Sequence, residues 1–190
     1  MRIVTGKFKR MEIISPPKEI ELRPTTDRVR EAIFDVIRFN IAGTTFLDLF
    51  AGSGAMGIEA ISEGADFAVF VEKDARAIKT IHTNIKRFKI ENQALVIRQD
   101  VLRFLQSPGS LDVIKEKFDF VFLDPPYASL LVGQTMKEIV NFPHLANESI
   151  IIAEHKWAES LSEEYQGKNT LKKFREKKYG KIAVSYFVVL

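Results

Sequence analysis

From residue 45 onward, short apolar segments alternate with helical patterns, and this alternation constrains the fold more than any other feature of the chain. The apolar segments lie at 45–50, 67–72, 94–98, 118–124 and 149–154, and the helical patterns lie near 55–63, 74–90, 101–106 and 129–141. Strands that are apolar on both faces and alternate with helices belong to a parallel sheet covered on both sides. We therefore expect an α/β fold with a doubly wound, Rossmann-like sheet.

The two ends of the chain depart from this alternation. Residues 171–178 and 181–190 flank Tyr179-Gly180, a pattern typical of an antiparallel hairpin. Residues 2–14 alternate weakly around Gly6 and predict a small N-terminal β-hairpin extension. We expect residues 1–24 to form this hairpin with a linker, and residues 25–190 to form the α/β domain.

Basic residues gather at the same two ends. Residues 1–10 contain four basic residues and no acid, and residues 168–181 contain seven basic residues and one acid, in a chain whose net charge is +3. The rest of the chain is therefore acidic. Basic ends on an acidic body favour contact with phosphate groups, although a solvated lysine surface would have the same composition.

The remaining composition narrows the class of protein. A chain of 190 residues, 46% of them hydrophobic, is typical of one globular domain. It has no cysteine, which excludes disulfides, thiolate metal sites and cysteine nucleophiles. The three histidines are scattered, so we expect no metal site. No apolar run approaches the roughly 20 residues of a membrane span, and no signal segment is visible. We expect a cytoplasmic monomer.

A glycine-rich loop follows the first apolar segment. Gly52, Gly54 and Gly57 match G-x-G-x-x-G after a strand and before a helix, and Glu72 lies twenty residues beyond Gly52. The glycines let a ligand approach the backbone, and an acid at the end of the second strand suits a ribose diol. This pattern alone is compatible with NAD, or with glycines that serve only a tight turn.

Asp48 and Asp100 favour a different ligand. Asp48 precedes the glycine loop, where its carboxylate would repel the pyrophosphate of a dinucleotide but suit an ammonium group. Asp100 follows the third strand, where it can hydrogen-bond the adenine amino group or simply cap a helix, and the adjacent Val101 is expected to contact the cofactor as well. Three acids after three successive strands suit S-adenosyl-L-methionine, a cation with no phosphate, better than NAD.

The fourth strand ends in Asp124-Pro125-Pro126-Tyr127. Two prolines stop the strand and hold the backbone in an extended turn. The Asp124 carboxylate and the Pro125 carbonyl can accept the hydrogens of an exocyclic base amine and turn its lone pair toward an electrophile. Tyr127 can stack a flipped base. The pattern predicts methyl transfer to an amine, with Asp124, Pro125 and Tyr127 as catalytic residues.

Several segments together resemble the bacterial 16S ribosomal RNA guanine-N2 methyltransferase family over essentially the whole chain. They are Gly6-Lys7-Phe8, the stretch 22–31 (LRPTTDRVRE), the stretch 47–54 (LDLFAGSG), Val71-Glu72-Lys73-Asp74 and Asp124-Pro125-Pro126-Tyr127. The resemblance implies a seven-stranded methyltransferase sheet and methylation of one guanine in the 16S rRNA of the small ribosomal subunit or an assembly intermediate. It also implies that the N-terminal hairpin holds RNA.

The residues expected to bind RNA lie near the N-terminus. They are Lys7, Arg10, Arg23, Thr25 and Arg28, with Pro126 beside the target base. Arginine gives bidentate contacts to phosphate, but a capped helix with surface arginines would have the same sequence pattern. The Asp-Pro-Pro-Tyr spacing does not distinguish guanine from adenine, so an adenine-N6 DNA methyltransferase is an alternative that the sequence leaves open. An NAD-dependent oxidoreductase and a non-catalytic RNA-binding assembly factor are the alternatives of another class.

Overall fold

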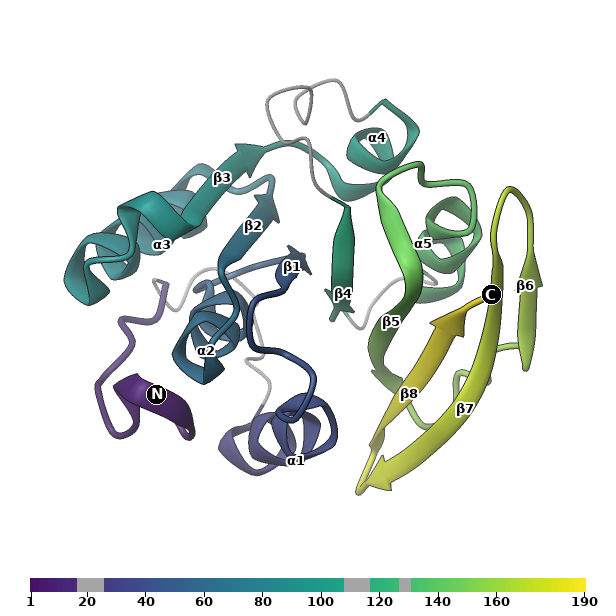
Figure 1. The fold of residues 1–190 in the computed structure, drawn as a ribbon, viewed down its shortest axis with the longest axis horizontal. Helices are drawn as coiled ribbons and strands as arrows, with labels where there is room; N and C mark the ends of the chain where they lie inside the picture. The colour runs from purple at the N-terminus through teal and green to yellow at the C-terminus, as the bar shows by residue number, and fades with distance from the viewer. Residues whose placement is uncertain (17–25, 108–116, 127–130) are drawn as a thin grey trace.

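A mixed eight-stranded sheet forms the centre of the computed structural model, which describes residues 1–16, 26–107, 117–126 and 131–190. The strand order is β3-β2-β1-β4-β5-β8-β7-β6 (Figure 1). The strands are β1 (Thr45–Leu49), β2 (Phe67–Glu72), β3 (Ala94–Arg98), β4 (Phe118–Leu123), β5 (Leu145–Lys156), β6 (Glu164–Gln166), β7 (Thr170–Tyr179) and β8 (Ile182–Val189).

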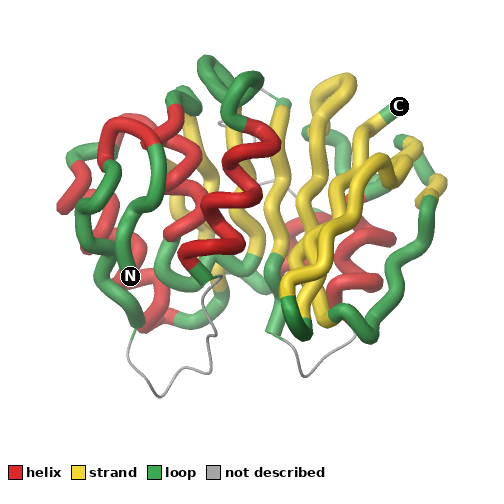
Figure 2. Tube along the Cα trace, turned by 90° about the horizontal axis from the view of Figure 1, so that it is seen from below, coloured by secondary structure: helices red, strands yellow, loops and turns green. Residues whose placement is uncertain are grey.

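Helices cover both faces of this sheet, as Figure 2 shows. One apolar cluster joins the sheet to α1 (Asp27–Ile37), α2 (Ala55–Glu63) and α3 (Ala75–Phe88). A second cluster joins the opposite face to α4 (Val101–Gln106) and α5 (Leu131–Ile139). The central strands β1, β2 and β4 are therefore buried on both sides, which explains why their sequences are mainly apolar. The doubly wound α/β fold expected from the sequence is confirmed.

The parallel part of the sheet fixes where a ligand binds. β1 pairs in parallel with both β2 and β4, so the strand order reverses between β1 and β4. Ligands of such sheets bind beyond the carboxyl ends of the strands at this reversal. Leu49 is level with both Val71 and Leu123, which brings the next residues, Glu72 and Asp124, to the same edge.

The C-terminal strands run antiparallel, as expected. β8 pairs with β5 on one side and with β7 on the other. A two-residue turn joins β7 to β8, and its first residue, Gly180, has a φ of +63°, which suits glycine. The sheet has one strand more than the seven expected, because the short β6 adds to the edge of β7. β6 consists of only three residues, none of them buried, so its sequence carries no strand pattern.

The N-terminal segment turns back on itself, but with less strand structure than a β-hairpin. A 3-10 helix, η1 (Gly6–Phe8), forms the turn, and a single antiparallel bridge joins Arg2 to Glu12. Ile3 and Ile13 on the two arms are each 1% exposed and belong to the cluster beneath α1 and α2. The expected boundary at residue 24 lies outside the described residues, so that division stays a prediction.

Candidate active site

The glycine loop between β1 and α2 has the backbone that the sequence motif demands. Gly52 and Gly54 have φ values of +54° and +78°, in the left-handed region that favours glycine. Phe50, just before the loop, also has a positive φ (+62°), a conformation unfavourable for a bulky side chain. A Cβ on Gly57 would lie 2.3 Å from a ring carbon of Phe70, so this glycine lets α2 pack closely on β2.

Glu72 holds the loop at the carboxyl edge of the sheet. Its Oε2 accepts a hydrogen bond from the Gly52 amide (3.0 Å). Its Oε1 accepts from the amides of Lys73 (2.8 Å) and Asp74 (2.9 Å). A carboxylate has about four acceptor sites, so three amide donors leave room for a ribose hydroxyl. Glu72 therefore lies against the glycine loop, at the end of β2 where the motif predicts it.

Asp48 is more deeply buried than the sequence implied. It lies within β1, is 1% exposed, and accepts a hydrogen bond from the Gly57 amide at 3.0 Å. Burial raises the pKa of Asp48 well above its ordinary value; the Gly57 hydrogen bond lowers it and the nearby Glu72 carboxylate raises it. The carboxylate thus fixes the first turn of α2, a role that sequence reasoning did not assign. Its contact with a ligand's ammonium group stays a prediction.

Asp100 caps α4 at the end of β3. Its Oδ1 accepts from the amides of Leu102 (3.1 Å) and Arg103 (3.5 Å), and Lys73 Nζ lies 3.9 Å from its Oδ2. The capping role weighed from the sequence is confirmed. The side chain keeps 44% exposure, so it can also meet a ligand at this edge. Val101, the first residue of α4, is buried beside it.

The predicted acceptor turn follows β4, next to β1 in the sheet. Asp124 is half-buried, Pro125 is buried and Pro126 is exposed. Because Leu123 is level with Leu49, Asp124 leaves the sheet beside the glycine loop. Tyr127 lies outside the described residues. Asp124, Glu72 and the loop therefore share one edge of adjacent strands, as the sequence order requires.

The residues expected to bind RNA do not all lie at this edge. The Phe8 amide donates to Ser62 Oγ (2.9 Å) in the last turn of α2. Since α2 starts at the glycine loop and runs away from it, Lys7 and its neighbour Arg10 lie near the far end of that helix, about 12 Å from its start. Arg28 is exposed in the first turn of α1. Arg23 and Thr25 lie outside the described residues.

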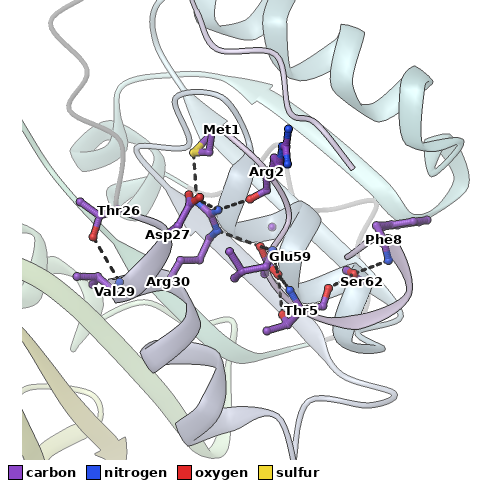
Figure 3. A network of polar contacts seen from close by, with 12 residues as sticks. Met1, Arg2, Thr5, Phe8, Thr26, Asp27, Val29, Arg30, Glu59 and Ser62 are labelled. Atoms are coloured by element: carbon purple, nitrogen blue, oxygen red, sulfur yellow. Dashed lines mark hydrogen bonds and ion pairs between the residues drawn. The ribbon is translucent and has the colours of Figure 1, made fainter. Parts of the chain in front are cut away.

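A buried ion pair that sequence reasoning missed anchors the N-terminal segment (Figure 3). Arg30 Nε donates to Glu59 Oε2 at 2.9 Å, and both side chains are fully buried. Glu59 also accepts from the Thr5 amide and hydroxyl (2.6 Å each) and from the Val4 amide (3.0 Å). Burial raises the pKa of Glu59, and its hydrogen bonds with Thr5 and the charge of Arg30 oppose that rise. The one signal in the sequence is that Glu59 stands among apolar and small residues in the first two turns of α2, before Ser62 and Glu63 end the helix.

The described part of the chain contains no group of three histidine, aspartate or glutamate side chains arranged as metal ligands. Within the same residues, no helix is long and apolar enough to cross a membrane. The arrangement instead offers a strained glycine loop, two acids at the strand ends beside it, and an Asp-Pro-Pro turn one strand away. Such a site can hold a nucleoside and present an amine acceptor next to it.

A mixed sheet whose parallel strands carry this loop after the first strand and an Asp-Pro-Pro turn after the fourth defines a Rossmann-like methyltransferase. The chain belongs to the family described as Conserved hypothetical protein 95, whose model matches residues 1–188. The family membership predicted from the sequence is thereby confirmed.

Individual relatives agree with this assignment. The chain is 34% identical over 154 residues to ribosomal RNA small subunit methyltransferase D of Escherichia coli K12, which covers 81% of this chain and 74% of that protein. It is 35% identical over 156 residues to the enzyme of the same name from Haemophilus influenzae, covering 81% and 78%. The solved structure of Escherichia coli yhhF, described as a candidate methyltransferase, superimposes with a TM-score of 0.82 at 28% identity, covering 100% and 97% of the two chains.

Proposed function

We propose that this protein transfers a methyl group from S-adenosylmethionine to the exocyclic N2 amine of one guanine in the 16S rRNA of the small ribosomal subunit. The broader statement, an S-adenosylmethionine-dependent methyltransferase that modifies rRNA, follows from the family and from relatives named for that activity. The observation that carries the site assignment is the placement of Asp124 beside the glycine loop, at the edge where Glu72 also ends its strand.

The cofactor residues fit an adenosyl cation. Glu72 would accept a hydrogen bond from a ribose hydroxyl, and Asp100 with Val101 would face the adenine. Gly52 and Gly54 leave the backbone open to the ligand, and Asp48 holds the loop from behind. When bound, S-adenosylmethionine supplies a methyl group whose carbon–sulfur bond breaks as the amine nitrogen bonds to the carbon.

The acceptor residues act on the amine. A guanine N2 lone pair is delocalised into the ring, so the free amine is a poor nucleophile. The Asp124 carboxylate and the Pro125 carbonyl would accept hydrogen bonds from the two N–H groups of the N2 amine. These hydrogen bonds would hold the nitrogen lone pair toward the methyl group. The methylated nitrogen then loses one proton, to water or to Asp124. Pro126 and Tyr127 would pack against the base, and Tyr127→Ala is expected to weaken base binding, because stacking is worth roughly 1–3 kcal/mol.

The substrate state and the cellular setting complete the proposal. The protein would act as a cytoplasmic monomer on the small subunit or an assembly intermediate, and Arg28 with the basic N-terminal segment would contact its phosphates. An adenine-N6 DNA methyltransferase would share the acceptor motif. The basic surfaces of this protein, however, are small for recognising duplex DNA. An NAD-dependent oxidoreductase would leave the Asp-Pro-Pro turn without a role, and a non-catalytic assembly factor would leave the cofactor motif without one.

Nucleoside analysis after methyl transfer tests the proposal. The purified protein is incubated with labelled S-adenosylmethionine and with unmethylated small subunits, naked 16S rRNA or duplex DNA, and the digested products are separated by mass spectrometry. N2-methylguanine in a ribosomal sample alone is expected. N6-methyladenine in DNA would overturn the substrate assignment, and RNA binding without any methyl transfer would favour the assembly factor.

A further inference from the structure

A basic cleft lies between the first turn of α1 and the tip of the β7–β8 hairpin, outside the site described above. Its volume is about 350 Å³, and Figure 1 shows α1 beside the end of this hairpin. None of the described residues that line it is acidic. The residues that line it include Thr26, Arg28 and Val29 at the start of α1, and Lys178, Tyr179 and Lys181 from the hairpin.

The strand register places this cleft at the same edge as Asp124. Leu123 of β4 is level with Ala153 of β5, and β5 continues to Lys156, which pairs with Ile182 at the start of β8. The hairpin tip therefore extends beyond the carboxyl ends of the parallel strands. β8 is two strands from β4, about 10 Å at the usual strand spacing. An RNA strand whose target nucleotide lies at Asp124 would therefore reach the cleft with a neighbouring part of its sugar-phosphate backbone.

Two cations of the cleft, Arg28 and Lys181, are available for a ligand. Neither Arg28 nor Lys181 forms an ion pair within the described parts of the chain, and both are exposed. Lys177 Nζ lies over the Tyr179 ring at 5.4 Å, which adds charge to the cleft wall. Lys178 Nζ already lies 4.6 Å from the centre of the Trp157 ring. Arg28 and Lys181 are therefore the two charges with which to test binding.

We propose that this cleft binds the sugar-phosphate backbone of the RNA substrate next to the methylated nucleotide. The inference rests on the proposed function and extends it, since it adds Lys181 and the hairpin tip to the RNA-binding surface. Lys7 and Arg10 lie toward the far end of α2, whereas the cleft lies at the edge that carries the acceptor turn. Arg28 and Lys181 clamp the phosphates beside the reacting base, and the N-terminal segment contacts RNA further away.

The test compares two double variants that each remove two positive charges. The cleft variant is Arg28→Ala/Lys181→Ala, and the control is Lys79→Ala/Arg87→Ala, two exposed residues of α3. Binding of 16S rRNA transcripts is measured at several KCl concentrations, together with S-adenosylmethionine binding and the kcat and KM of methyl transfer. A lost charged hydrogen bond weakens binding by about tenfold, so the cleft variant should raise Kd by roughly 100-fold.

The salt dependence and the cofactor affinity distinguish this result from a general defect. The slope of log Kd against log salt should fall by about 0.7 for each lost contact with single-stranded RNA. In the cleft variant, S-adenosylmethionine affinity and kcat should stay at wild-type values while the KM for RNA rises. Lys181→Arg, which keeps the positive charge, should bind RNA like the wild-type protein. A cleft variant that binds RNA as tightly as the control would overturn the inference. Failure of the wild-type protein to bind or methylate rRNA would instead overturn the proposed function.

Discussion

Arg30→Ala is expected to destabilise the protein strongly, because it leaves the Glu59 carboxylate buried without its counter-ion. The two side chains are fully buried and meet at 2.9 Å. Arg30 also donates to Asp27 Oδ1 (2.9 Å) and to the Arg2 carbonyl, so the variant loses contacts to both the helix and the N-terminal segment. Removing one partner of a buried pair costs about 3–5 kcal/mol.

This loss is a large part of the whole stability, which is about 5–15 kcal/mol for a protein. For a chain of this length, 1 kcal/mol corresponds to roughly 2–4 °C in Tm, so Tm should fall by about 6–20 °C. The Thr5 and Val4 donors to Glu59 remain, which keeps the loss from exceeding this range. Released from Arg30, the N-terminal segment should also become more sensitive to trypsin.

Urea unfolding followed by circular dichroism measures the change, and Arg38→Ala is the matched control. Arg38 ends the same helix, but its ion pair with Asp35 (3.3 Å) is about half exposed, so its loss should cost less than about 1 kcal/mol. The double variant Arg30→Met/Glu59→Leu should cost less than the sum of its single variants, because no charge is left unpaired. An Arg30→Ala variant as stable as Arg38→Ala would refute the reasoning.

Two further substitutions test the glycine loop and its buried acid. Gly57→Ala should cost about 1–3 kcal/mol, because its Cβ would meet the buried Phe70 ring at 2.3 Å, whereas Gly133→Ala in α5, with no atom of the described residues within 4 Å of the new Cβ, should stabilise by about 0.5–1 kcal/mol in the same urea titration; equal effects would contradict the packing argument. Because burial raises the pKa of Asp48, its contribution to stability is present below about pH 4 and is lost as pH rises toward the folded-state pKa. Asp48→Asn should therefore gain stability relative to wild type between pH 4.5 and 7.5, and a constant difference would show that this carboxyl does not titrate as burial implies.

The sequence predicted the parallel strands closely because burial on both faces gave them a continuous apolar pattern. β2 and β3 begin and end at the expected residues, and Glu72 and Asp124 lie at the expected edge. β5 is longer than expected, since it begins at Leu145 and contains a register shift that no alternation shows. Short elements such as β6 depend on their partner strand and leave no local pattern.

The features that the sequence did not predict depend on contacts between residues distant in sequence. Arg30 and Glu59 are 29 residues apart, and neither local segment indicates that tertiary packing buries the two side chains together. The burial of Asp48 also follows from its position inside β1, with Gly57 facing its carboxylate. The N-terminal hairpin was predicted as a strand pair, but its arms are held by side chains of α2 and α3 more than by each other.

Methyl transfer by Asp124→Ala tests the central claim most directly. Single-turnover transfer of labelled methyl groups to unmethylated small subunits is measured alongside S-adenosylmethionine binding, with Asp66→Ala, an exposed aspartate between α2 and β2, as the control. If Asp124 orients the acceptor amine, the rate should fall by about 100-fold or more while cofactor affinity and the control rate stay unchanged. An unchanged rate in Asp124→Ala would contradict the assignment of the acceptor site to this edge of the sheet.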